Sequence, residues 1–238
     1  MKTIFHEADK RGHVNFGWLD SHHSFSFGQY YDQNKMQFGM LRVLNDDIIT
    51  GGTGFGKHPH DNMEIISIPL TGSLAHTDST GTEAVINEND VQIMSAGTGI
   101  KHAEYNHQKD SATNFLQIWI LPKEKNIEPR YDQKTFKRDD RSNQFQTVVA
   151  PDDENAVWIN QNAWLSLSDL SAGTSINYQV KKAGNGVYAF VLNGSITING
   201  QSIFKRDALG IWDTETINIM ADTDTELLLI DVPMEGEV

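Results

Sequence analysis

The 238-residue sequence contains no cysteine. This absence excludes disulfide bonds, thiolate metal ligands and cysteine nucleophiles, so any bound metal must be held by nitrogen and oxygen donors. Basic residues are also scarce: 19 lysines and arginines stand against 32 aspartates and glutamates, which gives a formal net charge of −13. A field of this sign repels phosphate backbones and anionic lipid surfaces. We therefore expect neither direct nucleic-acid binding nor attachment to membranes.

Long apolar segments are missing as well. The amino-terminal stretch MKTIFHEADKRGH becomes charged after a few residues and lacks the apolar core of a secretory signal. No other segment approaches the roughly 18 apolar residues that a membrane-spanning helix needs. These features predict a soluble, cytoplasmic protein.

The apolar runs that are present have the length and composition of strands. They are rich in β-branched and aromatic residues and are separated by glycine, asparagine and aspartate, including two Asn-Gly turn signals. The runs cover residues 38–44, 63–70, 115–121, 187–192, 196–198 and 226–232. No long helical periodicity appears, and we expect at most a short helix near 132–142. The pattern predicts an all-β, mainly antiparallel fold, as a sandwich or barrel.

The two halves of the sequence resemble one another. IPLTGSL (68–74) matches FVLNGSI (190–196), which aligns Gly72 with Gly194, and each half ends in an apolar run before a proline, at 115–122 and 226–233. The similarity predicts a duplicated β-domain. We place the domains at residues 1–136 and 137–238, with the polar stretch KRDDRSNQ (137–144) as the connection.

Histidine is absent from the second half. All nine histidines lie at or before His107. The alignment of the halves places Val180, Lys182 and Gly186 at the positions that correspond to His58, His60 and Glu64, in that order, and a lysine cation cannot act as a metal ligand. We therefore expect a metal in the first domain alone and a structural role for the second.

Two pairs of metal-ligating residue types stand at the spacing of an extended strand. In GKHPHDNMEI (56–65), His58 and His60 point to the same face of a strand, while Pro59, which has no backbone donor, favours a strand start or an irregular edge. In GTGIKHAEYN (97–106), His102 and Glu104 repeat the spacing. Two neighbouring strands would supply three imidazoles and one carboxylate, a donor set that suits iron, copper, nickel or zinc.

Glu64 is a second candidate for the carboxylate. It follows His60 by four residues, so strict alternation would place both side chains on one face. The Asp61-Asn62 dipeptide between them is a turn signal that could break the alternation. In that case Glu64 would orient a ligand histidine by hydrogen bonding.

Several other side chains are weaker candidates. His22 and His23 could line a pocket mouth or simply pack in the amino-terminal arm. We expect His76, close to Asp78, to be solvated, His107 to act at most beside a ligand, and Arg42 to pair with an acidic neighbour. An apolar wall for an aromatic substrate could come from Phe25, Phe27, Phe38, Met40 and Phe55, although core packing is the commoner fate of such residues.

The histidine pairs occur in segments that resemble the two cupin motifs. The first motif, G-x5-H-x-H-x3-E, runs from Gly52 to Glu64, and the second, G-x-x-H-x3-N, runs from Gly99 to Asn106. Two departures are visible: Gly97 replaces the usual proline, and the glycine downstream of Glu64 comes one residue later than in the common form. More specifically, HPHDNMEI, SAGTGIKHAEYN and GWLDSHHSFSFGQYYD resemble pirin and the bacterial pirin-like quercetinases, over about the first 135 residues.

This resemblance implies a bicupin, two cupin barrels, with one metal ion in the amino-terminal barrel. Its ligands would be His58, His60, His102 and Glu104, with Glu64 as the alternative carboxylate, and Fe(II) would be favoured over copper, nickel or zinc. Four protein ligands leave one or two open positions on a six-coordinate metal.

The implied activity is that of a quercetin 2,3-dioxygenase. Such an enzyme opens the heterocyclic ring of a flavonol with dioxygen and releases carbon monoxide, and Glu104 or Glu64 would take the proton of the 3-hydroxyl group. The resemblance also implies an alternative, a regulatory protein in which the redox state of a bound metal controls binding to protein partners.

Overall fold

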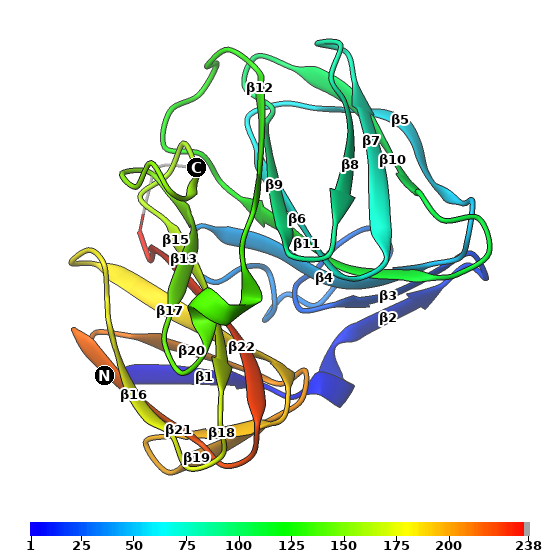
Figure 1. Cartoon of the computed structure of the whole chain (residues 1–238). Helices are drawn as coiled ribbons and strands as arrows, with labels where there is room; N and C mark the ends of the chain where they lie inside the picture. Colours follow the sequence, from blue (N-terminus) through cyan, green and yellow to red (C-terminus); the bar gives the residue numbers. More distant parts are fainter. Residues whose placement is uncertain (236–238) are drawn as a thin grey trace.

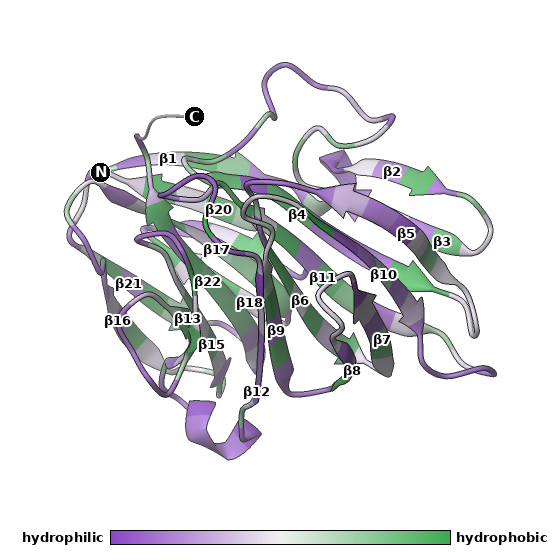
Figure 2. Ribbon diagram, turned by 90° about the horizontal axis from the view of Figure 1, so that it is seen from above, coloured by the Kyte–Doolittle hydropathy of each residue, from purple (hydrophilic) through white to green (hydrophobic). Residues whose placement is uncertain are grey.

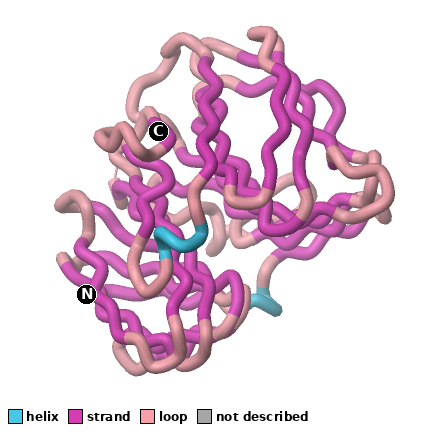
Figure 3. The backbone as a smooth tube through the Cα atoms, in the orientation of Figure 1, coloured by secondary structure: helices cyan, strands magenta, loops and turns pink. Residues whose placement is uncertain are grey.

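The structure, a computed structural model, describes residues 1–235 and is built almost wholly from antiparallel strands (Figures 1 and 3). The predicted all-β fold is confirmed. Helical structure among these residues is limited to two short 3-10 turns, η1 (Ala8–Lys10) and η2 (Arg138–Arg141), so the helix expected near 132–142 shrinks to η2 because Arg130–Thr135 form a strand. None of the helical segments in the described part of the chain could cross a bilayer.

The strands form two pairs of sheets, each pair with a seven-stranded and a four-stranded member. The first large sheet has the order β12 (Arg130–Thr135), β9 (Asp90–Ser95), β6 (Glu64–Thr71), β11 (Thr113–Ile120), β4 (Leu41–Ile49), β3 (Leu19–His23) and β2 (Gly12–Asn15). It faces the small sheet of β5 (Gly54–His60), β10 (Ile100–Asn106), β7 (Ser73–Asp78) and β8 (Glu83–Asn87).

The second pair repeats this arrangement. Its large sheet has the order β1 (Lys2–His6), β20 (Ala208–Trp212), β17 (Asn185–Asn193), β22 (Thr225–Pro233), β15 (Trp164–Leu170), β13 (Gln146–Ala150) and β14 (Val157–Trp158). Its small sheet has the order β16 (Ser175–Gln179), β21 (Thr216–Ala221), β18 (Ser195–Ile198) and β19 (Gln201–Phe204). The internal similarity of the sequence thus corresponds to a repeated architecture.

The aligned glycines occupy equivalent turns in the two halves. Gly72 connects β6 to β7 with φ 79°, and Gly194 connects β17 to β18 with φ 84°. A Cβ atom at Gly72 would lie 2.5 Å from the Thr113 hydroxyl oxygen, and one at Gly194 would lie 2.6 Å from that of Thr225. Only glycine tolerates both the backbone angle and the close approach.

The first strand of each repeat is exchanged between the halves. The elements β1, η1 and β2 open the first repeat as β12, η2 and β13 open the second. However, β1 pairs with β20 in the second large sheet, whereas β12 pairs with β9 in the first (Figure 1). The sequence division at 136/137 did not predict that Lys2–His6 belongs to the sheet of the other half.

The large sheets pack against each other through alternate residues of their central strands. Leu116, Ile118 and Ile120 of β11 share one buried cluster with residues of β17 and β22, including Phe190 and Leu228. The opposite faces of the large sheets pack toward the small sheets, so the molecule has four layers. Figure 2 shows the hydrophobic residues concentrated on central strands such as β17, β22 and β6.

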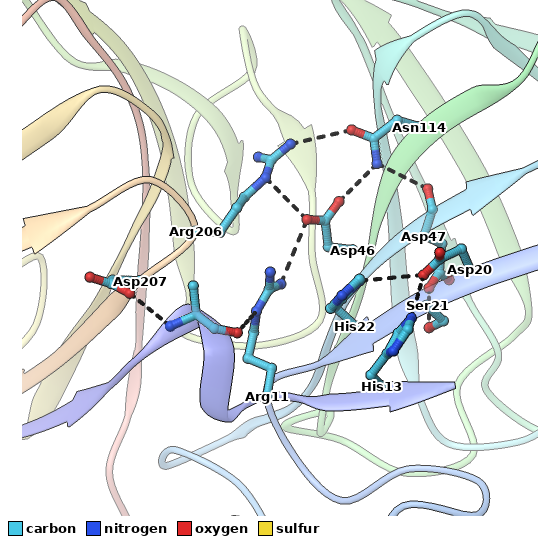
Figure 4. A network of polar contacts seen from close by, with 11 residues as sticks. Arg11, His13, Asp20, Ser21, His22, Asp46, Asp47, Asn114, Arg206 and Asp207 are labelled. Carbon is cyan, nitrogen blue, oxygen red and sulfur yellow. Dashed lines mark hydrogen bonds and ion pairs between the residues drawn. The ribbon is translucent and has the colours of Figure 1, made fainter. Parts of the chain in front are cut away.

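A polar network also connects the halves. Arg206, from the loop before β20, approaches the Asp46 carboxylate at 3.1 Å and donates to Asn114 Oδ1 at 3.3 Å (Figure 4). Arg11 reaches the same Asp46 carboxylate at 3.6 Å. Two cations thus share one largely buried anion at the junction.

We predict that replacing Ile118 by alanine lowers the free energy of unfolding by about 2–5 kcal/mol, because it leaves a cavity in the core shared by both halves. The matched change Ile48→Ala, at an exposed site on neighbouring β4, should alter it by no more than about 0.5 kcal/mol. Chemical denaturation followed by circular dichroism measures both. Equal losses for the two variants would contradict the assigned packing.

Candidate functional site

The two predicted histidine pairs lie side by side on neighbouring strands. β5 and β10 are antiparallel, with His58 opposite His102 and His60 opposite Ile100. The three imidazole rings converge: their centroids are 4.7 Å apart for His58 and His60, 4.5 Å for His58 and His102, and 4.9 Å for His60 and His102. β5 is an edge strand, in agreement with the expectation from Pro59.

Glu104 lies next to this histidine cluster. The β5–β10 register shifts between His102 and Glu104. The Glu104 carboxylate accepts hydrogen bonds from Ser67 Oγ at 2.9 Å and Gln117 Nε2 at 2.7 Å. These contacts hold the carboxylate on the inner face of the barrel, where it lines the same cavity as the histidines.

The surroundings keep the imidazoles of His60 and His102 neutral. Burial and the nearby His102 and His58 rings lower the pKa of His60 to about 4. Burial, with a smaller contribution from His58, lowers the pKa of His102 to about 3. Neutral imidazole is the form that binds metals.

The donor set fits a divalent metal ion. Donor atoms of His58, His60 and His102 all lie within 4.8 Å of one another, and both buried ring nitrogens of His102 lack a hydrogen-bond partner among residues 1–235. Buried polar atoms without partners are uncommon and call for an explanation. Nitrogen and carboxylate donors of this kind suit a transition metal.

The cluster lines a cavity of about 200 Å³ between the large and small sheets of the first half. Aromatic rings form much of its wall, and the rest comes from strands of both sheets. The aromatic lining residues outside the histidines are Phe16, Phe27, Phe55 and Trp119. Trp119 packs edge-on against His60 at 4.9 Å and against Phe27 at 5.2 Å.

Besides the two ring nitrogens of His102, three buried polar atoms of lining residues have no hydrogen-bond partner within the described chain. They are Nδ1 of His23, Oδ1 of Asn45 and Nε1 of Trp119. A mostly apolar pocket with a few unmet polar groups is typical of a site for a small organic ligand.

Glu64 is placed differently from Glu104. Its carboxylate accepts hydrogen bonds from Ser95 Oγ at 2.7 Å and from the backbone N–H of Asn160, in the second half, at 3.2 Å. It does not line the cavity. Burial raises the pKa of Glu64 to about 6, although both hydrogen bonds oppose the rise.

The expectation that His76 is solvated is wrong. The residue is only 1% exposed, its Nε2 lies 3.1 Å from Asp78 Oδ2, and its ring centroid lies 5.3 Å from that of His102. His76 and Glu104 are directly opposite each other on β7 and β10, which explains the burial. The His-x-Asp spacing at 76–78 repeats the strand pattern of the other pairs and was a usable signal.

The remaining polar candidates divide between the cavity and the surface. His23 is buried and lines the cavity, whereas His22 faces outward and stacks on His13. His107 is exposed and outside the cavity lining. Arg42 donates to two backbone carbonyl oxygens, those of Ser26 and Met36, instead of pairing with an acid.

The five residues suggested as an apolar wall lie in two different places, the cavity and the core between the halves. Phe27 and Phe55 line the cavity. Phe25, Phe38 and Met40 belong to the core between the halves. The sequence therefore does not distinguish the aromatic residues that line the cavity from those that form the central core.

Asp47 is a cavity residue that the sequence analysis missed. It is buried on β4, lines the cavity, and accepts a hydrogen bond from the Ser21 hydroxyl. Burial raises the pKa of Asp47 to about 7, and the nearby Asp46 and Glu104 carboxylates contribute. Its signal was an acidic residue two positions after Asn45, on the same face of a strand.

Comparison with known proteins supports a common origin for this arrangement. Residues 5–120 match the family model described as Pirin, and residues 147–232 match the model of the quercetinase C-terminal cupin domain. The chain is 44% identical over 228 residues to a quercetin 2,3-dioxygenase of Escherichia coli (strain K12), covering 95% of this chain and 97% of that protein. The chain belongs to the pirin family.

Other relatives of this pirin-family chain agree. It is 42% identical to a pirin-like protein of Caulobacter vibrioides over 225 residues, covering 94% of this chain and 96% of that protein. The crystal structure of the bacterial pirin YhhW from Escherichia coli in complex with nickel(II) superposes with a TM-score of 0.92 at 42% identity, covering 98% and 99% of the two chains. The repeated barrels are those of a bicupin.

We predict that Asp47→Asn changes how the stability of the protein depends on pH. The folded-state pKa of Asp47 lies above its unfolded value, so between about pH 4 and pH 7 the folded protein binds more protons at this site. Stability from this group is therefore present at low pH and lost as pH rises through 7. Since one pKa unit corresponds to about 1.4 kcal/mol, the variant should gain up to a few kcal/mol over the wild type above pH 7.

Denaturant titrations of both proteins from pH 4 to pH 8 measure this difference. The exposed change Asp110→Asn is the control and should leave the pH profile of the wild type intact. A constant gap between Asp47→Asn and wild type across the range would show that Asp47 ionises normally.

Proposed function

We propose that this chain is a metal-dependent dioxygenase that opens the heterocyclic ring of flavonols such as quercetin. The observation that carries the proposal is the convergence of three imidazoles on the wall of a partly aromatic cavity that the Glu104 carboxylate also lines. The name of the 44% identical relative, quercetin 2,3-dioxygenase, supports the same reaction.

In this proposal His58, His60, His102 and Glu104 hold one divalent transition metal ion, with Fe(II) favoured. The bound ion supplies positive charge that acidifies a substrate hydroxyl, together with open positions for the substrate and dioxygen. The low pKa values of His60 and His102 keep these rings available as ligands at neutral pH.

Glu104 is the residue best placed to take the proton of the 3-hydroxyl group. Ser67 and Gln117 each donate to one of its oxygens, so they fix the orientation of the carboxylate. Glu64 bonds to Ser95 and Asn160 outside the cavity, which disfavours it as the base.

The cavity walls would orient a flat, hydroxylated ring system. The Phe27, Phe55 and Trp119 rings provide flat apolar surfaces, and the unmet Trp119 Nε1 and Asn45 Oδ1 can bond to hydroxyl or carbonyl groups of the ligand. The apolar lining excludes bulk water, which protects a deprotonated flavonol from reprotonation.

We predict that the metal-loaded protein consumes dioxygen with quercetin and releases carbon monoxide. Glu104→Gln, which removes the proton acceptor at constant size, should lower kcat/KM by about 10²-fold or more. His102→Ala should lower the metal content as well. An oxygen electrode and elemental analysis provide the measurements, with free metal and the exposed change Glu124→Gln as controls.

The proposal fails if the metal-loaded wild type consumes no more dioxygen than free metal with any flavonol tested. Full metal content and full activity in both His102→Ala and Glu104→Gln would separately remove these residues from the site. A redox-dependent change in affinity for a protein partner, without oxygen uptake, would favour the regulatory alternative.

We also predict that Trp119→Phe weakens binding of a hydroxylated substrate. The change keeps an aromatic ring against His60 but deletes the Nε1 donor, which has no partner within residues 1–235. A lost hydrogen bond of about 0.5–1.5 kcal/mol raises KM two- to about tenfold, with a smaller effect on kcat. An unchanged KM in steady-state assays would show that this N–H does not contact the substrate.

A further inference from the structure

A second group of metal-ligating side chains lies on the outside of the first barrel. Along β3, Leu19, Ser21 and His23 line the cavity, so the alternate residues Asp20 and His22 face the opposite side of the sheet. His13 of the adjacent edge strand β2 lies on the same outer face (Figure 4). None of the three belongs to the cavity or to its histidine cluster.

Strand pairing brings these side chains together. His13 and His22 are directly opposite each other in the β2–β3 register, and their rings stack with centroids 4.4 Å apart and planes inclined by 17°. Nε2 of His13 lies 2.8 Å from Asp20 Oδ1, and Nδ1 of His22 lies 3.6 Å from the same oxygen. One donor atom from each residue lies within 4.8 Å of the others.

These separations match those between ligands of one metal ion. Imidazole nitrogens and carboxylate oxygens bind zinc at about 2.1 Å, so two ligands at a tetrahedral angle lie about 3.4 Å apart. The 2.8 and 3.6 Å distances bracket this value.

A neighbouring amide holds the carboxylate in a suitable orientation. Asn15 Nδ2 donates to Asp20 Oδ2 at 3.1 Å, which leaves Oδ1 directed to the histidines. Hydrogen bonds of this kind commonly orient carboxylate ligands.

The charged side chains nearby also allow a cation to bind at His13, Asp20 and His22. Arg11 is the nearby cation, but its guanidinium is directed to Asp46, 3.6 Å away, and not to Asp20 (Figure 4). Partial burial, followed by the charge of Arg11, lowers the pKa of His22, which favours its neutral, metal-binding form. All three side chains remain between about one third and one half exposed, so an ion can reach them from solvent.

We propose that His13, Asp20 and His22 form a second binding site for one divalent transition metal ion of the zinc, nickel and copper class. The site is independent of the metal centre in the cavity. Because the inner face of the same hairpin forms the cavity wall, a bound ion would tie the edge strand β2 to β3 and stiffen that wall.

The stoichiometry of zinc binding tests the proposal. Untagged protein stripped of metal is titrated with Zn²⁺ in a calorimeter, and bound metal is counted after dialysis. The wild type should bind two equivalents, the double variant His13→Ala/His22→Ala one, and the exposed control His107→Ala two. A double variant that binds as many equivalents as the wild type overturns the proposal.

A second measurement separates this site from the cavity and from the proposed function. In His102→Ala, where the cavity site is impaired, added Cu²⁺ should give an electron paramagnetic resonance spectrum with splitting from two imidazole nitrogens. Adding His13→Ala and His22→Ala to this background should abolish that spectrum, and Asp20→Asn, which keeps the size of the side chain, should weaken binding. Splitting that survives the loss of both histidines contradicts the site, whatever the catalytic activity.

Discussion

The pleat of the first large sheet is the constraint on which the rest of the structure depends. Successive side chains of a strand point to opposite faces, and both faces of β11 are buried. Leu116, Ile118 and Ile120 therefore pack against the second half, while Gln117 and Trp119 reach the cavity. A shift of the strand by one residue would put polar and aromatic cavity groups into the central core and remove the hydrogen bond that Gln117 donates to Glu104.

The same burial sets the protonation of the site. Imidazoles enclosed by apolar walls lose solvation of the charged form, so His60 and His102 remain neutral well below pH 7, although nearby carboxylates oppose the shift. Asp47, in the same surroundings, is driven toward its neutral form. Glu104 accepts hydrogen bonds from both Ser67 and Gln117, whereas the Asp47 carboxylate accepts one from Ser21. The enclosure therefore favours neutral imidazoles, and the two donors distinguish one carboxylate from the other.

Features fixed by local spacing could be predicted from the sequence, and features fixed by distant pairing could not. The i, i+2 pairs at 58/60 and 102/104 require only that each segment is a strand, and the all-β fold follows from apolar runs of strand length. The burial of His76 depends on its pairing with Glu104 across β7 and β10, and the exchange of β1 depends on β20, some 200 residues away. Asp47 was missed because the sequence does not show that β4 is covered on both faces.

The duplication also explains why Glu64 differs from its motif partners. Glu64 and Gly186 are equivalent: Glu64 pairs with Ile120 of β11, and Gly186 pairs with Val232 of β22. Glu64 accepts a hydrogen bond from Asn160 of the second half, whereas a Cβ at Gly186 would lie 2.9 Å from the Phe38 ring of the first. Both positions thus lie at the contact between the halves. The Glu64 carboxylate is therefore held by the contact between the two halves. Glu104 lies on a strand remote from that contact and remains the acidic group available to the histidines.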